Sequence, residues 1–153
     1  MTDMQRLLRR AAVVVTASAA VVATAAGPAA AVSRFPGTIQ SGASGYCSYS
    51  NWDGVFFCDS DAYWPKPDTY PQVFVVGPDR NVYTRWSSAT TVSGWQNMGG
   101  TCKPDPGIEI RFWVNDWGLT INCKGTDNAW YHRERYDNGR WDAQWIKGYA
   151  YPS

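Results

Sequence analysis

The chain has 153 residues and a formal net charge of +1, with 14 Lys and Arg against 13 Asp and Glu. This near neutrality argues against a nucleic-acid partner, which needs a basic stripe to replace condensed counterions, and against an anionic membrane surface, which needs a polybasic cluster. Nine Trp, nine Tyr and five Phe, divided by 14 Gly and nine Pro, predict one all-β domain of short strands.

Residues 1–31 have the pattern of a secretory signal peptide. Three arginines precede an uncharged run at residues 11–26, and Ala29 and Ala31 provide the small residues of a cleavage site. The apolar run is shorter than the roughly 20 residues that cross a bilayer. We therefore expect a secreted, extracellular protein whose mature chain does not insert into a membrane and begins with an N-terminal tail at residues 32–45.

Export makes disulfides the expected state of the four cysteines, for which three connectivities exist. A hairpin turning at residues 51–54 would place Cys47 directly opposite Cys58. Cys102 precedes an expected strand and Cys123 ends the return strand, so these two pair with each other. The alternative connectivities would cross between the two halves of the chain.

The chain repeats itself with a shift of 48 residues. Four residues of the first copy recur at aligned places in the second, and a Trp follows each copy with a shift of 50 residues. A period near 48 residues that is made of short strands is typical of a β-propeller blade. The aligned pairs are Gly77 and Gly125, Asp79 and Asp127, Tyr83 and Tyr131, Arg85 and Arg133, and then Trp95 and Trp145.

The β-repeat domain, residues 46–153, is expected to contain about two four-stranded antiparallel blades. The second blade, residues 101–149, is predicted as a meander with strands at 107–114, 119–124, 129–136 and 141–147. The first blade, residues 46–100, is predicted to be irregular, with the Cys47 hairpin as an extra piece or a degraded third copy. Its expected strands are at 55–59, 72–76, 81–87 and 94–98, and the stretch YWPKPDTYP is an insertion because proline cannot occupy a central strand.

The stretches GPDRNVYTR, GWQNMGG and KPDPG resemble the repeats of bacterial tectonin-type β-propellers, which include fucose-binding lectins. The resemblance covers residues 72–148 and implies propeller-like blades. Two blades cannot close a propeller, which takes at least about four. The resemblance therefore implies that several chains complete a ring as a homo-oligomer, or that the array is a remnant with covered edges.

In related propeller lectins the sugar lies in grooves between blades, and the resemblance implies the same here. An aromatic ring would stack on the C–H face of a pyranose, and a guanidinium would donate to its hydroxyls. The two Trp residues have an equally simple alternative role in sealing blade against blade. The candidate ligand-binding residues are Arg85, Arg133, Trp95, Trp145, Tyr83 and Tyr131.

No catalytic residue, metal site or cofactor is expected. His132 is the only histidine, which excludes a histidine cluster for zinc. Asp59 and Asp61 lack further carboxylates at the spacing of a calcium loop, and no spacing fixes a glycosidase pair among Glu134, Asp137 and Asp142. The expected function is secreted carbohydrate binding. A secreted protein-interaction or envelope-associated module, and a small hydrolase or toxin that uses His132 or an unpaired Cys, remain as alternatives.

Overall fold

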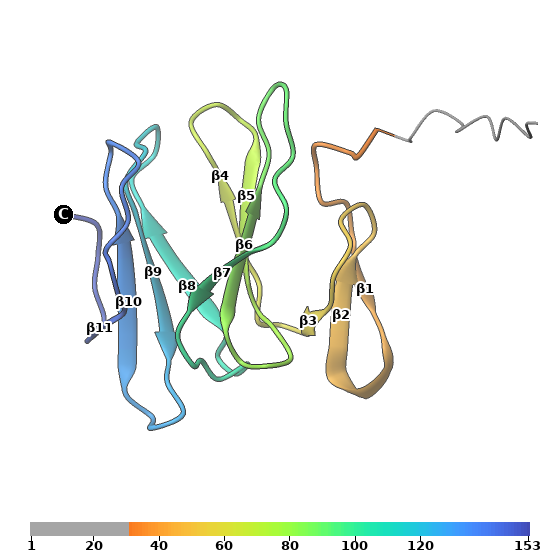
Figure 1. The fold of residues 1–153 in the computed structure, drawn as a ribbon. Helices are drawn as coiled ribbons and strands as arrows, with labels where there is room; N and C mark the ends of the chain where they lie inside the picture. The colour runs from red at the N-terminus through yellow and green to blue at the C-terminus, as the bar shows by residue number, and fades with distance from the viewer. Residues whose placement is uncertain (1–30) are drawn as a thin grey trace, which may run out of the picture. The chain divides into compact units, whose positions relative to one another are not determined.

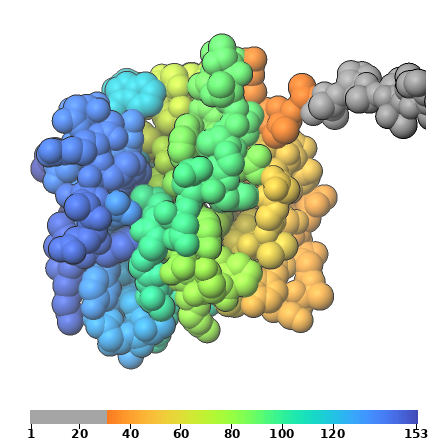
Figure 2. Space-filling model, viewed as in Figure 1, coloured from red at the N-terminus to blue at the C-terminus, as the bar shows by residue number. Residues whose placement is uncertain are grey.

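The computed structural model describes residues 31–153, so the predicted signal peptide lies outside the described residues apart from its last residue. The described residues form three antiparallel sheets of three, four and four strands, side by side and without an α-helix (Figure 1). These residues contain no helical segment that is long and apolar enough to cross a membrane. Side chains close the spaces between the sheets (Figure 2). The prediction of an all-β fold is confirmed.

The first sheet contains β1 (Ile39–Ser41), β2 (Tyr46–Tyr49) and β3 (Phe56–Phe57), with a short 3-10 turn, η1 (Ala43–Gly45), between β1 and β2. Residues 32–45 are therefore more than the expected tail, because they provide a strand. The hairpin register also differs from the prediction, since Cys47 pairs with Phe56 and lies two residues from the expected register. The Cys47–Cys58 disulfide still forms, with a Cα separation of 4.9 Å.

The second sheet is a complete meander of β4 (Ala62–Pro65), β5 (Pro71–Val76), β6 (Val82–Trp86) and β7 (Gln96–Gly99). The prediction of an irregular first blade is wrong in two respects. The predicted insertion contains all of β4 except Ala62, and residues 55–59 contribute β3 to the first sheet instead. β4 lies at the edge of its sheet, where a proline such as Pro65 costs no ladder hydrogen bond.

The third sheet contains β8 (Ile108–Phe112), β9 (Leu119–Lys124), β10 (Trp130–Arg135) and β11 (Ile146–Lys147) in the spatial order β11-β10-β9-β8. This confirms the predicted meander of residues 101–149. The last strand is shorter than expected, because Ile146 and Lys147 form its ladder with β10 and Trp141 makes an isolated bridge with Arg135.

The core lies on both faces of the second sheet. Strand β5 is buried throughout. Its Val73 and Val75 belong to a cluster shared with the first sheet, and Phe74 and Val76 belong to a cluster shared with the third. Alternation along a strand explains the division, since successive side chains point to opposite faces. The middle sheet therefore joins the other two.

Both predicted disulfides are confirmed, and no cysteine is free. The Cys102–Cys123 bond joins the segment after β7 to the end of β9. Two disulfides are consistent with an oxidising environment, extracellular or periplasmic.

Candidate functional site

Two of the grooves that open where neighbouring sheets meet are lined by residues of the repeat. Groove I, between the second and third sheets, has a volume of about 370 Å³. Groove II, between the first and second sheets, has a volume of about 290 Å³. The lining residues of groove I are Gly100, Thr101, Cys102, Cys123, Gly125, Thr126, Asp127, Tyr131 and Trp145. Those of groove II are Gly54, Val55, Val75, Gly77, Pro78, Asp79, Tyr83 and Trp95.

The two grooves are built by the two copies of the repeat. Gly125, Asp127 and Tyr131 line groove I, and the aligned residues of the first copy line groove II. Trp145 and Trp95 complete the respective walls. The structure thus brings together four of the six predicted site residues, as two Tyr and Trp pairs. The repetition in the sequence corresponds to a repeated groove.

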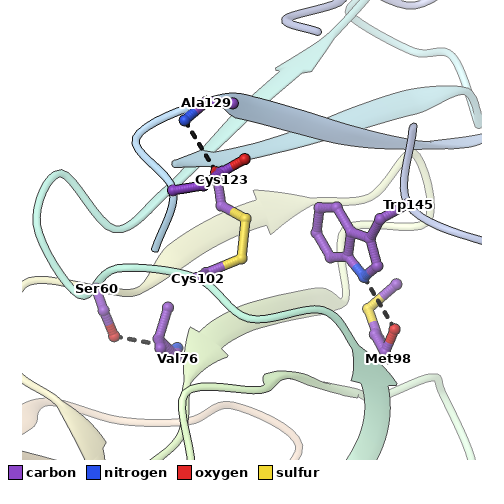
Figure 3. The surroundings of a disulfide bond; sticks show 8 residues. Ser60, Val76, Met98, Cys102, Cys123, Ala129 and Trp145 are labelled. Atoms are coloured by element: carbon purple, nitrogen blue, oxygen red, sulfur yellow. Dashed lines mark hydrogen bonds between the residues drawn. A yellow bond between two sulfur atoms is a disulfide. The ribbon is translucent and has the colours of Figure 1, made fainter. Parts of the chain in front are cut away.

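Each groove tryptophan bonds to the neighbouring sheet. The indole Nε1 of Trp145 donates to the carbonyl oxygen of Met98 at 3.1 Å, and the Cys102–Cys123 disulfide lies close to the same ring (Figure 3). The indole Nε1 of Trp95 donates in the same way to the carbonyl of Asp53. Both rings are half-buried. Because the polar N–H is already bonded, what each ring offers to a ligand is apolar surface.

A glycine with positive φ faces each indole ring. Gly100 has a φ of 79° and Gly54 a φ of 104°. A Cβ atom at either position would lie 2.7 Å from the indole Nε1 of Trp145 or Trp95, closer than real Cβ contacts. Both the left-handed backbone and the close approach therefore require glycine.

An aspartate and a tyrosine are fixed to each other in both grooves. The Tyr131 hydroxyl donates to Asp127 Oδ2 at 2.9 Å, and the Tyr83 hydroxyl donates to Asp79 Oδ2 at 2.9 Å. Hydrogen bonds from the Ala129 amide and Tyr131 hold the pKa of Asp127 below its ordinary value, and the bond to Asp127 raises the pKa of Tyr131. Each groove therefore holds a charged carboxylate acceptor beside a protonated phenol.

The grooves differ in polarity. Groove I includes the hydroxyl-bearing Thr101 and Thr126, and Lys147 Nζ lies 3.8 Å from Asp127 Oδ2. Groove II has Val55 and Pro78 at the corresponding places. Its carboxylate also accepts a bond from the Asn81 side chain at 2.9 Å. Groove I thus offers more unused hydrogen-bonding groups, and groove II offers more apolar wall.

Arg85 and Arg133 line neither groove, although both were expected to donate to a sugar. Arg85 is 6% exposed, donates from Nε to the Ser93 carbonyl at 2.8 Å and forms an ion pair with Asp53. Arg133 donates to the carbonyls of Asp142 at 2.8 Å and Met98 at 2.9 Å. Their donors are used within the protein, where they join one sheet to the next.

The groove glycines and aspartates were not predicted as site residues. The Gly-x-Asp spacing of Gly77 with Asp79, repeated at Gly125 with Asp127, was the available signal, but it is equally typical of a turn. Gly54 and Gly100 carry no such signal, because only the fold brings them to a tryptophan about 40 residues later in the chain.

The other candidate residues have structural partners. His132 donates from Nδ1 to the Gly148 carbonyl at 2.9 Å, and Asp61 accepts a bond from the Tyr49 hydroxyl at 3.0 Å. Within residues 31–153 no group of three or more His, Cys, Asp or Glu is arranged to hold a metal ion. The groove residues are therefore the best candidates for ligand contact.

No protein-family model matches the chain, and no curated protein matches it. Its function is therefore inferred from the geometry of the two grooves.

Proposed function

We propose that the protein is a secreted, lectin-like protein that binds carbohydrate in grooves I and II. The observation that supports this most is the recurrence, in both grooves, of a half-buried indole beside a fixed aspartate and tyrosine. A pyranose needs this pair of surfaces, since it presents a C–H face to an aromatic ring and hydroxyls to rigid acceptors.

Size and polarity support a small polyol ligand. The groove volumes are near the lower end of the roughly 300 to 1,000 Å³ that small-ligand sites occupy. Asp127 and Asp79 can accept hydrogen bonds from sugar hydroxyls, and the tryptophan N–H groups are bonded to the protein, which leaves the ring faces to stack on a sugar. No step requires a metal or a reacting side chain, and we propose binding without catalysis.

We further propose a sugar of the fucose type. A 6-deoxy sugar carries a methyl group at C5 in place of the usual hydroxymethyl group. In groove II, Val55, Val75 and Pro78 lie beside Trp95 and Tyr83, and this apolar wall suits such a methyl group. The three successive meanders would then be an open segment of a tectonin-type propeller, with one sugar between each pair of neighbouring sheets.

A protein-interaction module is the second candidate. The turn between β8 and β9 exposes Trp113 by 59% and Val114 by 83%. Adjacent exposed apolar side chains at a turn tip are typical of a surface that contacts a partner. This function predicts binding to a polypeptide that free monosaccharide does not compete away.

A glycan array tests the first proposal with the disulfide-bonded protein and with fucose, mannose and galactose as competitors. We expect selective binding that one sugar abolishes and that Asp127→Asn together with Asp79→Asn removes. Trp113→Ala is the matched control, because Trp113 is outside both grooves and its loss should leave sugar binding unchanged. Absence of binding by folded protein, or binding lost only in the control, would exclude the groove sites.

A further inference from the structure

The outer face of the third sheet is polar where the corresponding face of the second sheet is apolar. Asn122 takes the place of the buried Phe74, 48 residues earlier. On the neighbouring strand, Glu109 pairs with Asn122 where Ala62 pairs with Phe74. The face that Phe74 and Ala62 form packs against the third sheet. The equivalent face of the third sheet is unsuited to packing against a further apolar sheet.

Residues 148–153, which we call the C-terminal segment, lie on this polar face. After β11 the chain runs back along the outer side of the sheet (Figure 1). The Gly148 amide donates to the Trp130 carbonyl at 2.8 Å. The Asn122 side chain bonds to both the amide and the carbonyl of Ala150, at 2.9 and 3.0 Å. Asn122 thus gives the segment the two main-chain hydrogen bonds that a neighbouring strand would otherwise provide.

Side chains of the C-terminal segment complete the contact. The Tyr149 hydroxyl donates to Glu109 at 2.7 Å, and the Arg111 guanidinium lies 5.5 Å from the Tyr149 ring and 5.8 Å from the Tyr151 ring. At the other end of the segment, Ser153 donates to Glu134 from its amide at 2.8 Å and from its hydroxyl at 2.6 Å. Strands β8, β9 and β10 all hold the segment, so its position is specific.

The repeat would offer a third groove at this face. Gly148 follows the last strand as Gly100 follows β7, and its φ of 123° is also positive. No atom lies within 4 Å of a Cβ built on Gly148, whereas tryptophans crowd Gly100 and Gly54. The backbone position that receives a tryptophan in grooves I and II therefore has none here.

We propose that the C-terminal segment is a cap that closes the outer face of the third sheet against a second copy of the chain. Repeat arrays need polar end faces to remain soluble and separate. At the opposite end of the array, Gln40 and Ser48 pair on the face of the first sheet turned away from buried Cys47, and Tyr46 shares this face with Ser48. Each chain then acts alone with two grooves, and ring closure requires release of the cap.

Light scattering after gel filtration tests this inference with the disulfide-bonded protein over a wide range of concentration. The intact protein is expected to be monomeric. Asn122→Leu removes both side-chain bonds to Ala150 and exposes an apolar residue under the released segment, so an increase of at least about twofold in mass is expected. Gln96→Leu, an exposed strand position away from the segment, is the control and should remain monomeric.

Hydrogen exchange at the Ala150 amide separates release of the cap from general unfolding. In the intact protein this amide should be protected, and Asn122→Leu should abolish its protection while the β5 amides stay protected. An intact protein that is already oligomeric would overturn the inference. A folded Asn122→Leu variant that loses protection at Ala150 and remains monomeric would overturn it as well. If Asn122→Leu does not fold, a double variant, Tyr149→Ser with Tyr151→Ser, takes its place, because it leaves the sheet residues unchanged. Its mass and its Ala150 amide protection then decide.

Discussion

The indole N–H of Trp145 donates to the main-chain carbonyl of Met98, and this bond joins the third sheet to the second at the rim of groove I. Trp95 repeats the arrangement with Asp53 at groove II. In both grooves the residue best placed to stack on a ligand is also one that holds two sheets together. Sheet packing and the proposed sugar stacking are therefore combined in one side chain.

Substitutions at Trp145 should separate these two roles. Trp145→Phe keeps an aromatic face and loses the hydrogen bond, so we expect a loss of about 1 kcal/mol in the free energy of unfolding with sugar binding retained. Trp145→Ala should cost about 3 kcal/mol and remove binding in groove I. Urea denaturation and sugar titration measure the two effects. Equal loss of binding in both variants would contradict the stacking role.

Replacement of Gly100 by alanine should destabilise the protein by about 1 to 3 kcal/mol, because its φ is positive and the added Cβ meets Trp145. Gly94→Ala is the matched control, since Gly94 has no positive φ and open space around its Cβ position. Thermal or urea unfolding compares them. A Gly100→Ala protein as stable as the control would show that the close approach to Trp145 is not required.

Arg85→Ala should lower stability by about 2 kcal/mol, because it removes the ion pair with Asp53 of the first sheet's loop and the hydrogen bond to the Ser93 carbonyl. Sugar affinity should change little once the protein is folded. Urea denaturation and sugar titration of Arg85→Ala and of the unmodified protein measure the two quantities. Unchanged stability with abolished sugar binding would restore the original expectation that Arg85 contacts the ligand.

The sequence predicted the third sheet well and the first two less well. The apolar run of β9 between turn-forming residues has few alternative interpretations. Strands β1 and β3 are too short to produce a periodic pattern, and their pairing depends on the disulfide and the adjoining sheet. Strand β4 was missed because its prolines were read as excluding a strand, although at a sheet edge they exclude only a central one.

The site was predicted in part for a related reason. Alternation showed that Tyr83 and Arg85 share a face, and the structure places both toward the first sheet. Alternation did not show that Asp53 and the Ser93 carbonyl would accept the hydrogen bonds of Arg85. Nor did it show that Tyr83 would line a groove. Contacts between sheets depend on residues far apart in the sequence, which a repeat pattern does not specify.

Alkaline pH should release the C-terminal segment. Burial, with the bond to Glu109, raises the pKa of Tyr149 from its ordinary value of 10.0 to about 12. The stability that the raised pKa contributes is complete below pH 10 and is lost as the pH rises through the folded value near 12. Ala150 amide protection and tyrosinate absorbance should change together in this range. A Tyr149→Phe protein should lack the tyrosinate step, and an identical profile in it would contradict the assignment.

The buried hydroxyl of Thr120 should lower the stability of the protein. Within the described residues its hydroxyl is the one buried side-chain polar atom that has no hydrogen-bond partner. Thr120→Val removes this unpaired group at nearly constant shape, so we expect a gain of about 1 kcal/mol in the free energy of unfolding. Thr84→Val is the comparison, since Thr84 bonds to Gln72 and to the Val73 carbonyl, and it should be destabilising. A loss of stability in Thr120→Val would show that its hydroxyl is satisfied in solution.

The most direct test of the central claim is a titration of the disulfide-bonded protein with fucose, followed by NMR at the indole N–H of Trp95 and Trp145 and the amides of Gly54 and Gly100. Carbohydrate binding in the grooves predicts saturable shifts at these signals that Asp127→Asn and Asp79→Asn diminish in groove I and groove II respectively. Signals that do not move with fucose, mannose or galactose, or that move only at the turn of Trp113, would contradict it.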